Sequence, residues 1–140
     1  MRLFKRLLHF LRDRGGDEFA QTALVTPVIV LLTLALFNMS IAGFASVNAS
    51  NAANHGARIG SVNQRAVTAA ASSAAMQSIS NAPVGEYVVN VSGGGRPGAT
   101  ITVTVQWQVQ NYMAPIMEFM GFGSPVLGGT STATFRQEGW

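Results

Sequence analysis

The chain of 140 residues contains no cysteine, only two histidines and few charged residues. The lack of cysteine excludes a disulfide framework and thiolate chemistry. His9 and His55 lie in different parts of the chain, and no serine, histidine and carboxylate set typical of a nucleophilic site accompanies them. Metal-ligand spacing is also absent. These absences predict a protein that is not an enzyme and that binds no cofactor or metal.

The longest gap in charge runs over residues 19–57, which contain no Asp, Glu, Lys or Arg. Five of the nine basic residues precede it, all within residues 1–14. About 20 apolar residues suffice for a helix to cross a bilayer, and basic flanks tend to stay in the cytoplasm. We therefore expect a single span of the cytoplasmic membrane, with the N-terminus inside and the C-terminal domain extracytoplasmic.

Net charge offers little support for a nucleic-acid partner. The formal charge is +3, but beyond residue 46 only four arginines stand against three glutamates. A nucleic-acid site needs a clustered basic face, and the basic cluster here lies in the expected cytoplasmic segment. The glycine-rich stretch at residues 93–98 lacks the Lys and Ser/Thr of a phosphate-binding loop. We expect neither a nucleic acid nor a small-molecule substrate.

Four segments follow from the pattern along the chain: a basic cytoplasmic leader (1–16), a transmembrane helix (17–47), an extended outer helix (48–81) and a small β domain (82–140). The outer helix is expected to be largely continuous and to end before Pro83. Its predicted packing stripe recurs at spacings of three and four, and consists of Ile59, Val62, Ala66, Ala69, Ser73 and Met76.

The β domain is recognised by alternation of apolar and polar residues. Strands are expected near residues 87–91, 101–109 and 130–136. The middle one has period-two patterning, which is typical of a half-buried antiparallel strand. Its apolar face should form the core between sheet and helix, and consists of Ile101, Val103, Val105, Trp107 and Val109. We expect Trp107 to be buried there. The fold class is thus α+β, with a long helix packed by its outer half on a small antiparallel sheet.

Polar and small residues within the anchor indicate contacts with other helices. Pro27 lies inside the span and Asn38 is the only amide near its middle. Small and hydroxylated residues are favoured where membrane helices pack together, so Pro27 and Asn38 are candidate anchor-packing residues. Two alternatives remain open: a lone anchor whose threonines bond to their own helix, and an Asn38 that lies near the outer headgroups.

Three segments in order resemble the TadE-like family, the minor pseudopilins of the tight-adherence (Flp-type) pilus. The head RGGDEFAQTALVTP (residues 14–27) is similar to the family's leader, cleavage site and early helix. NAANHGARIGSV (51–62) is similar to the motif after the family's anchor, and ITVTVQWQV with GGTSTATFRQE to its closing strands. The resemblance implies a pilin-like fold and a structural role in pilus assembly.

The resemblance also implies processing by a prepilin peptidase after Gly16, which leaves Asp17 as the new N-terminus. Type IV pilins carry Glu at the fifth mature position, and Gln21 stands there in this chain. Gln accepts a hydrogen bond from an amine without the charge assistance that roughly doubles the bond's strength. The implied partners are the peptidase, other pilin or pseudopilin subunits through the N-terminal helix, and the lipid bilayer.

The main prediction is therefore a structural, membrane-anchored pseudopilin. A single-pass, signal-anchored adaptor or sensor with an extracytoplasmic β domain is the first alternative. The second is a secreted domain released near Ala45 or Ala49, although residues 19–47 exceed the roughly 7–15 residue core of secretory signals.

Overall fold

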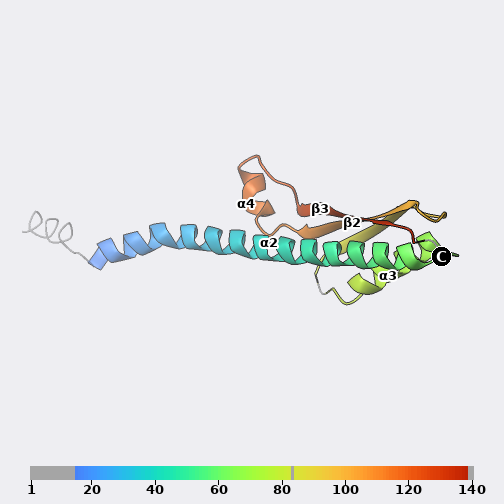
Figure 1. The fold of residues 1–140 in the computed structure, drawn as a ribbon. Helices are drawn as coiled ribbons and strands as arrows, with labels where there is room; N and C mark the ends of the chain where they lie inside the picture. The colour runs from blue at the N-terminus through green and yellow to red at the C-terminus, as the bar shows by residue number, and fades with distance from the viewer. Residues whose placement is uncertain (1–14, 83, 139–140) are drawn as a thin grey trace, which may run out of the picture. The chain divides into compact units, whose positions relative to one another are not determined.

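The computed structural model describes residues 15–82 and 84–138, which form three helices and three strands (Figure 1). The expected leader up to Arg14, the helix-ending Pro83 and the terminal Trp140 lie outside these residues. The elements in chain order are α2 (Gly15–Val62), α3 (Val67–Ile79), β1 (Glu86–Gly93), β2 (Thr100–Gln110), α4 (Ala114–Phe119) and β3 (Val126–Arg136). The chain divides into two compact units between Leu36 and Phe37.

Helix α2 is continuous over 48 residues and contains Pro27 without ending there. The helix ends at Val62 because the backbone of the next residues forms hydrogen bonds with the side chain of Asn63. The Oδ1 atom of Asn63 accepts hydrogen bonds from the backbone N–H groups of Arg65 (3.2 Å) and Ala66 (3.0 Å). Such local bonds compete with helix continuation. The prediction of one continuous outer helix over 48–81 is therefore wrong, and two helices occupy this region.

Small residues allow α2 and α3 to pack antiparallel at close range. A Cβ atom on Gly56 would lie 2.7 Å from the carbonyl oxygen of Ala71 and 2.9 Å from Cβ of Ala75. A Cβ on Gly60 would lie 2.8 Å from Cβ of Ala71. The predicted stripe was also wrong, since all six of its residues are exposed. The buried face instead contains Ala49, Ala52, Ala53, Gly56, Ala57 and Gly60 of α2, and Val67, Ala71, Ala74 and Ala75 of α3.

The three strands form an antiparallel sheet in the order β1-β2-β3. In its register Val103 pairs with Val91 on one side and with Ala133 on the other. The turn between β1 and β2 contains Gly93, Gly94 and Gly95 at φ values of 84°, 80° and 95°, a region that glycine adopts without steric cost. The predicted fold class is confirmed: a long N-terminal helix packs on a small antiparallel sheet in an α+β, pilin-like arrangement.

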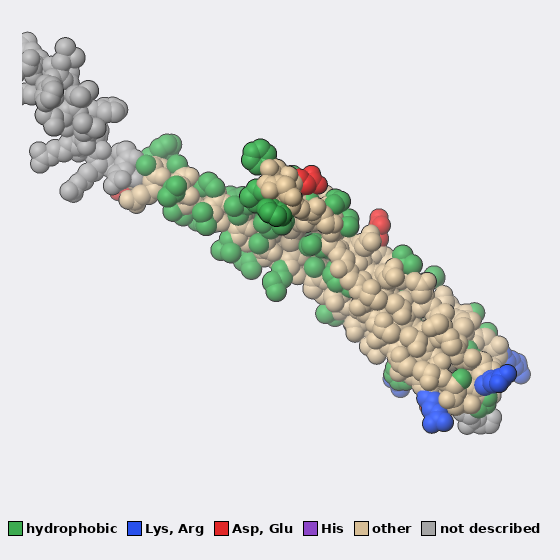
Figure 2. Space-filling model, turned by 90° about the horizontal axis from the view of Figure 1, so that it is seen from above, with side chains coloured by type: hydrophobic (Ala, Val, Ile, Leu, Met, Phe, Trp, Pro, Cys, Tyr) green, Lys and Arg blue, Asp and Glu red, His purple; other side chains and the backbone are tan. Residues whose placement is uncertain are grey.

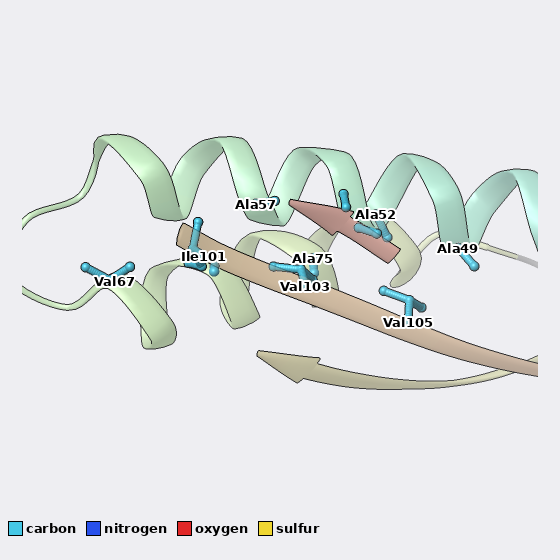
Figure 3. Packing of buried hydrophobic residues seen from close by; sticks show 11 residues of the cluster. Ala49, Ala52, Ala57, Val67, Ala75, Ile101, Val103 and Val105 are labelled. Carbon is cyan, nitrogen blue, oxygen red and sulfur yellow. The ribbon is translucent and has the colours of Figure 1, made fainter. Parts of the chain in front are cut away.

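One face of the sheet packs on the α2–α3 pair and forms the core (Figure 3). Ile101, Val103 and Val105 of β2 are fully buried there, and they are the largest fully buried side chains of the described residues. Their helical partners are mostly alanines, so the core joins a smooth helical surface to a row of branched side chains. This arrangement places α4 and the loops around it at the end of β2 that is remote from the α2–α3 turn.

Candidate assembly site

The N-terminal part of α2, residues 19–36, has an apolar surface along its length (Figure 2). Seven large apolar side chains there are at least half exposed: Phe19, Leu24, Val28, Ile29, Val30, Leu32 and Leu36. Full burial of one such side chain contributes roughly 1.5–3 kcal/mol of favourable free energy. Covering this surface with lipid or a protein partner would therefore contribute on the order of 10 kcal/mol. Within the described residues, one helix is long and apolar enough to span a membrane, with the candidate span set at Glu18–Val62.

The residues of the predicted cleavage region lie at the start of α2. Gly16 and Asp17 belong to its first turn, and Gln21 lies one turn later with its side chain exposed. Pro27 is also exposed within the helix. The roles of these residues in cleavage and packing stay predictions.

The threonines of this segment bond to their own helix. The Oγ1 atoms of Thr22, Thr26 and Thr33 donate to carbonyl oxygens four residues earlier, at distances of 2.8, 2.6 and 2.8 Å. This geometry agrees with the alternative of a lone anchor, in which the threonine hydroxyls bond to carbonyl groups of their own helix. Because these hydroxyls already have partners in the helix, the N-terminal part of α2 presents a more apolar surface than its threonine content suggests.

Asn38 does not lie on a surface open to another helix. It is 6% exposed, and its Nδ2 atom donates to Oδ1 of Asn111 at 2.7 Å. Its Oδ1 atom accepts the backbone N–H of Tyr112 at 3.0 Å. The prediction that Asn38 packs against a neighbouring anchor is corrected, because both ends of its amide bind the β2–α4 connection of the same chain. This residue fastens the connection to α2.

Asn111 is the hydrogen-bond partner of Asn38, and the sequence analysis did not identify it. Its Nδ2 atom donates to the carbonyl oxygen of Ser124 (2.9 Å), and its Oδ1 atom also accepts the N–H of Met113 (3.0 Å). Its backbone N–H donates to the carbonyl of Pro125 (3.0 Å). Asn111 thereby closes the loop of residues 111–125 at its base. The available signal was an Asn placed directly after an alternating strand, where its side chain commonly organises turns.

An aromatic pair and a cavity lie next to the Asn38–Asn111 hydrogen bond. The rings of Phe37 and Tyr112 meet edge to face, with centroids 5.3 Å apart and an interplanar angle of 62°. Beside them lies a cavity of about 770 Å³ whose lining includes Ile41, Val109 and Val126. Among the described residues, no group of three or more His, Cys, Asp or Glu could hold a metal ion. The cavity lining also contains the polar residues Glu86, Gln108 and Gln110.

The predicted core residues of β2 lie where their alternation places them, with one difference. Ile101, Val103, Val105 and Val109 are at most 3% exposed. Trp107 is only partly buried: its ring lies over Gly129 of β3, where a Cβ atom would come 2.8 Å from Cζ2 of the indole. The expectation of a buried Trp107 is met only in part: the side chain packs against the core cluster and over Gly129, and the rest of it is exposed.

Comparison with known families gives one finding. Residues 19–58 match the TadE-like protein family. The match covers 40 of the 140 residues, from the apolar surface of α2 into the part that packs on the sheet. It confirms the predicted family resemblance for this TadE-like segment, and leaves the resemblance of β2 and β3 to the family as a prediction. No curated protein and no solved structure matches the chain.

The structure gives the TadE-like segment a physical basis at its C-terminal end. The stretch NAANHGAR, residues 51–58, has one buried face, which consists of Ala52, Ala53, Gly56 and Ala57. Asn51, Asn54, His55 and Arg58 are exposed. Small residues at these four positions are required because α3 and the sheet approach α2 closely there. The motif is therefore a packing surface.

Proposed function

We propose that this chain is a structural, non-enzymatic pseudopilin of the tight-adherence pilus, anchored in the cytoplasmic membrane and processed by a prepilin peptidase. The observation that carries the proposal is the TadE-like match over residues 19–58, which coincides with the helix that exposes its apolar side chains. A pilin-like protein needs such a helix for the bilayer first and for neighbouring subunits afterwards. The α+β arrangement supports the same reading.

The orientation is part of the proposal. Five basic residues precede the apolar helix and would hold the N-terminus in the cytoplasm, so the sheet and α3 lie outside. Partners are then the peptidase on the inner side, and other pilin or pseudopilin subunits along residues 19–36 of α2. No step of this role needs a cofactor.

Processing at Gly16 is the sharpest test. The peptidase must approach the backbone closely, and glycine alone has no Cβ, so Gly16→Leu should leave a full-length membrane protein. Gly15→Leu is the matched control, because it adds the same side chain one residue earlier and should still be cut. Mass spectrometry of the protein purified from membranes reads the result.

The N-terminus of the natural protein separates the alternatives in the same experiment. An N-terminus at Asp17 supports the pseudopilin. Met1 indicates a signal-anchored adaptor or sensor, and a start just after Ala45 or Ala49 indicates a secreted domain. Loss of the first 16 residues from Gly16→Leu would show that the cleavage site is assigned wrongly.

A further inference from the structure

The connection between β2 and β3 carries an exposed apolar cluster that the pseudopilin role does not by itself explain. Its members are Ile116, Phe119, Met120 and Phe122, which are exposed by 36%, 93%, 60% and 70%. Hydrophobic side chains gather on this loop in Figure 2, beside an acidic side chain. Glu118 is the only charged residue between Arg96 and Arg136. A cluster this exposed is costly in water and marks an interaction surface.

The apolar cluster belongs to the loop of residues 112–123, called the apolar loop below. Hydrogen bonds to Asn38 fix the position of this loop along α2. Asn38 binds Asn111 and Tyr112 at the base of the loop, and Phe37 packs on Tyr112. Residues 19–37 of α2 rise about 28 Å at 1.5 Å per residue, which is close to the roughly 30 Å of a bilayer's hydrocarbon core. Asn38 thus follows directly after a stretch that is long enough to span that core.

In the outer unit, residues 37–140, the arginines lie at the opposite end from the apolar loop, whereas Glu86 and Glu118 lie at the loop end. Arg65 is in the α2–α3 turn and Arg96 in the β1–β2 turn, while Arg136 ends β3 beside Gly98. These turns adjoin the start of β2, and the apolar loop follows its end. Eleven residues of strand span about 36 Å, and Figure 2 shows the basic side chains gathered at one end. The outer unit is therefore polarised along β2.

Resting on the proposed membrane anchoring, we propose that the apolar loop, residues 112–123, inserts into the outer membrane–water interface. Phe119, Met120 and Phe122 enter the acyl boundary, Tyr112 lies at headgroup level as aromatic residues commonly do, and Glu118 stays in the headgroup region. The basic end of the domain then points into solution. The partner is a lipid surface, and the loop adds a second membrane contact to the helix.

The test uses the absence of cysteine, which permits a single labelled position in the full-length protein. Met120→Cys carries an environment-sensitive fluorophore, and the protein is reconstituted in phosphatidylcholine vesicles containing some phosphatidylglycerol. Nitroxide quenchers are placed on the lipid headgroups or near the acyl-chain ends. Leu31→Cys is the control for the anchor, and Thr132→Cys, on the exposed face of β3, is the control for solution.

We expect a blue-shifted Met120 label that headgroup nitroxides quench strongly, a Leu31 label quenched by acyl-chain nitroxides, and a Thr132 label quenched by neither. Replacing Phe119 and Phe122 together by Ser should reduce quenching at Met120 to the level of Thr132. Both side chains are largely exposed, so this double variant should fold normally.

Two outcomes would overturn the proposal, and they are distinguishable from failure of the anchor. A Met120 label without lipid quenching, together with a quenched Leu31 label, rejects loop insertion and leaves the anchored protein intact. A Met120 label shifted only at high protein density, with crosslinks between copies, identifies a neighbouring subunit as the partner instead. If the Leu31 label is also unquenched, membrane anchoring itself fails, and the proposed function with it.

Discussion

Replacing Gly56 by Ala should destabilise the outer unit, although the same change normally stabilises a helix. Ala is favoured over Gly inside a helix by about 1 kcal/mol. At Gly56 the added Cβ would lie 2.7 Å from the carbonyl oxygen of Ala71, a backbone atom that cannot rotate away, and 2.9 Å from Cβ of Ala75. Overpacking of this kind costs about 1–3 kcal/mol. We expect a net loss of up to about 2 kcal/mol in the free energy of unfolding.

Gly43→Ala provides the matched control in the same helix. No atom lies within 4 Å of a Cβ built on Gly43, so the helix preference acts alone and should stabilise by about 0.5–1 kcal/mol. The measurement is denaturant unfolding of the full-length protein in detergent, followed by Trp107 fluorescence in a Trp140→Phe background. The two substitutions should change the free energy of unfolding in opposite directions, so the two variants should differ by about 2 kcal/mol. Equal stabilisation by both would refute the close packing of α2 on α3.

Three further changes test other parts of the structure. Asn38→Ala should cost about 1–3 kcal/mol by leaving buried polar groups unpaired and should expose residues 111–125 to protease; Asn54→Ala, an exposed amide on the same helix, should do neither. Trp107→Ala should cost about 1–3 kcal/mol, below the 3–5 of a fully buried aromatic; because this variant lacks the fluorescent probe, its unfolding is followed by circular dichroism, and a larger loss there would contradict its partial exposure. Gln21→Glu should restore the charged partner for a neighbour's terminal amine and raise recovery in sheared pilus fractions without altering processing; abundant filaments of the unmodified protein alone would instead identify a major subunit.

The fold class could be predicted because its signals are periodic and strong. The charge-free stretch at residues 19–57 marks the long helix, and the alternation at residues 101–109 marks the central strand. Both depend on the contrast between apolar and polar residues, which sequence records directly.

The helical packing could not be predicted in this way. Its buried face consists of alanine and glycine, whose low hydrophobicity gives no periodic contrast, while the larger Ile59, Val62 and Met76 are exposed. The break at Asn63 depends on one side-chain oxygen binding two N–H groups. The Asn38–Asn111 bond joins residues 73 positions apart, and no local pattern reports such a pairing.

The alanine and glycine surface between α2 and α3 also has an entropic consequence. Alanine and glycine have no side-chain rotamers to lose on folding, whereas ordering a long side chain costs up to about 2 kcal/mol. The contact among Ala52, Ala53, Gly56, Ala71 and Ala75 therefore brings two helices together without freezing any side-chain torsion. Since every substitution at these positions other than alanine to glycine enlarges the side chain, most changes of this surface would give up the close approach.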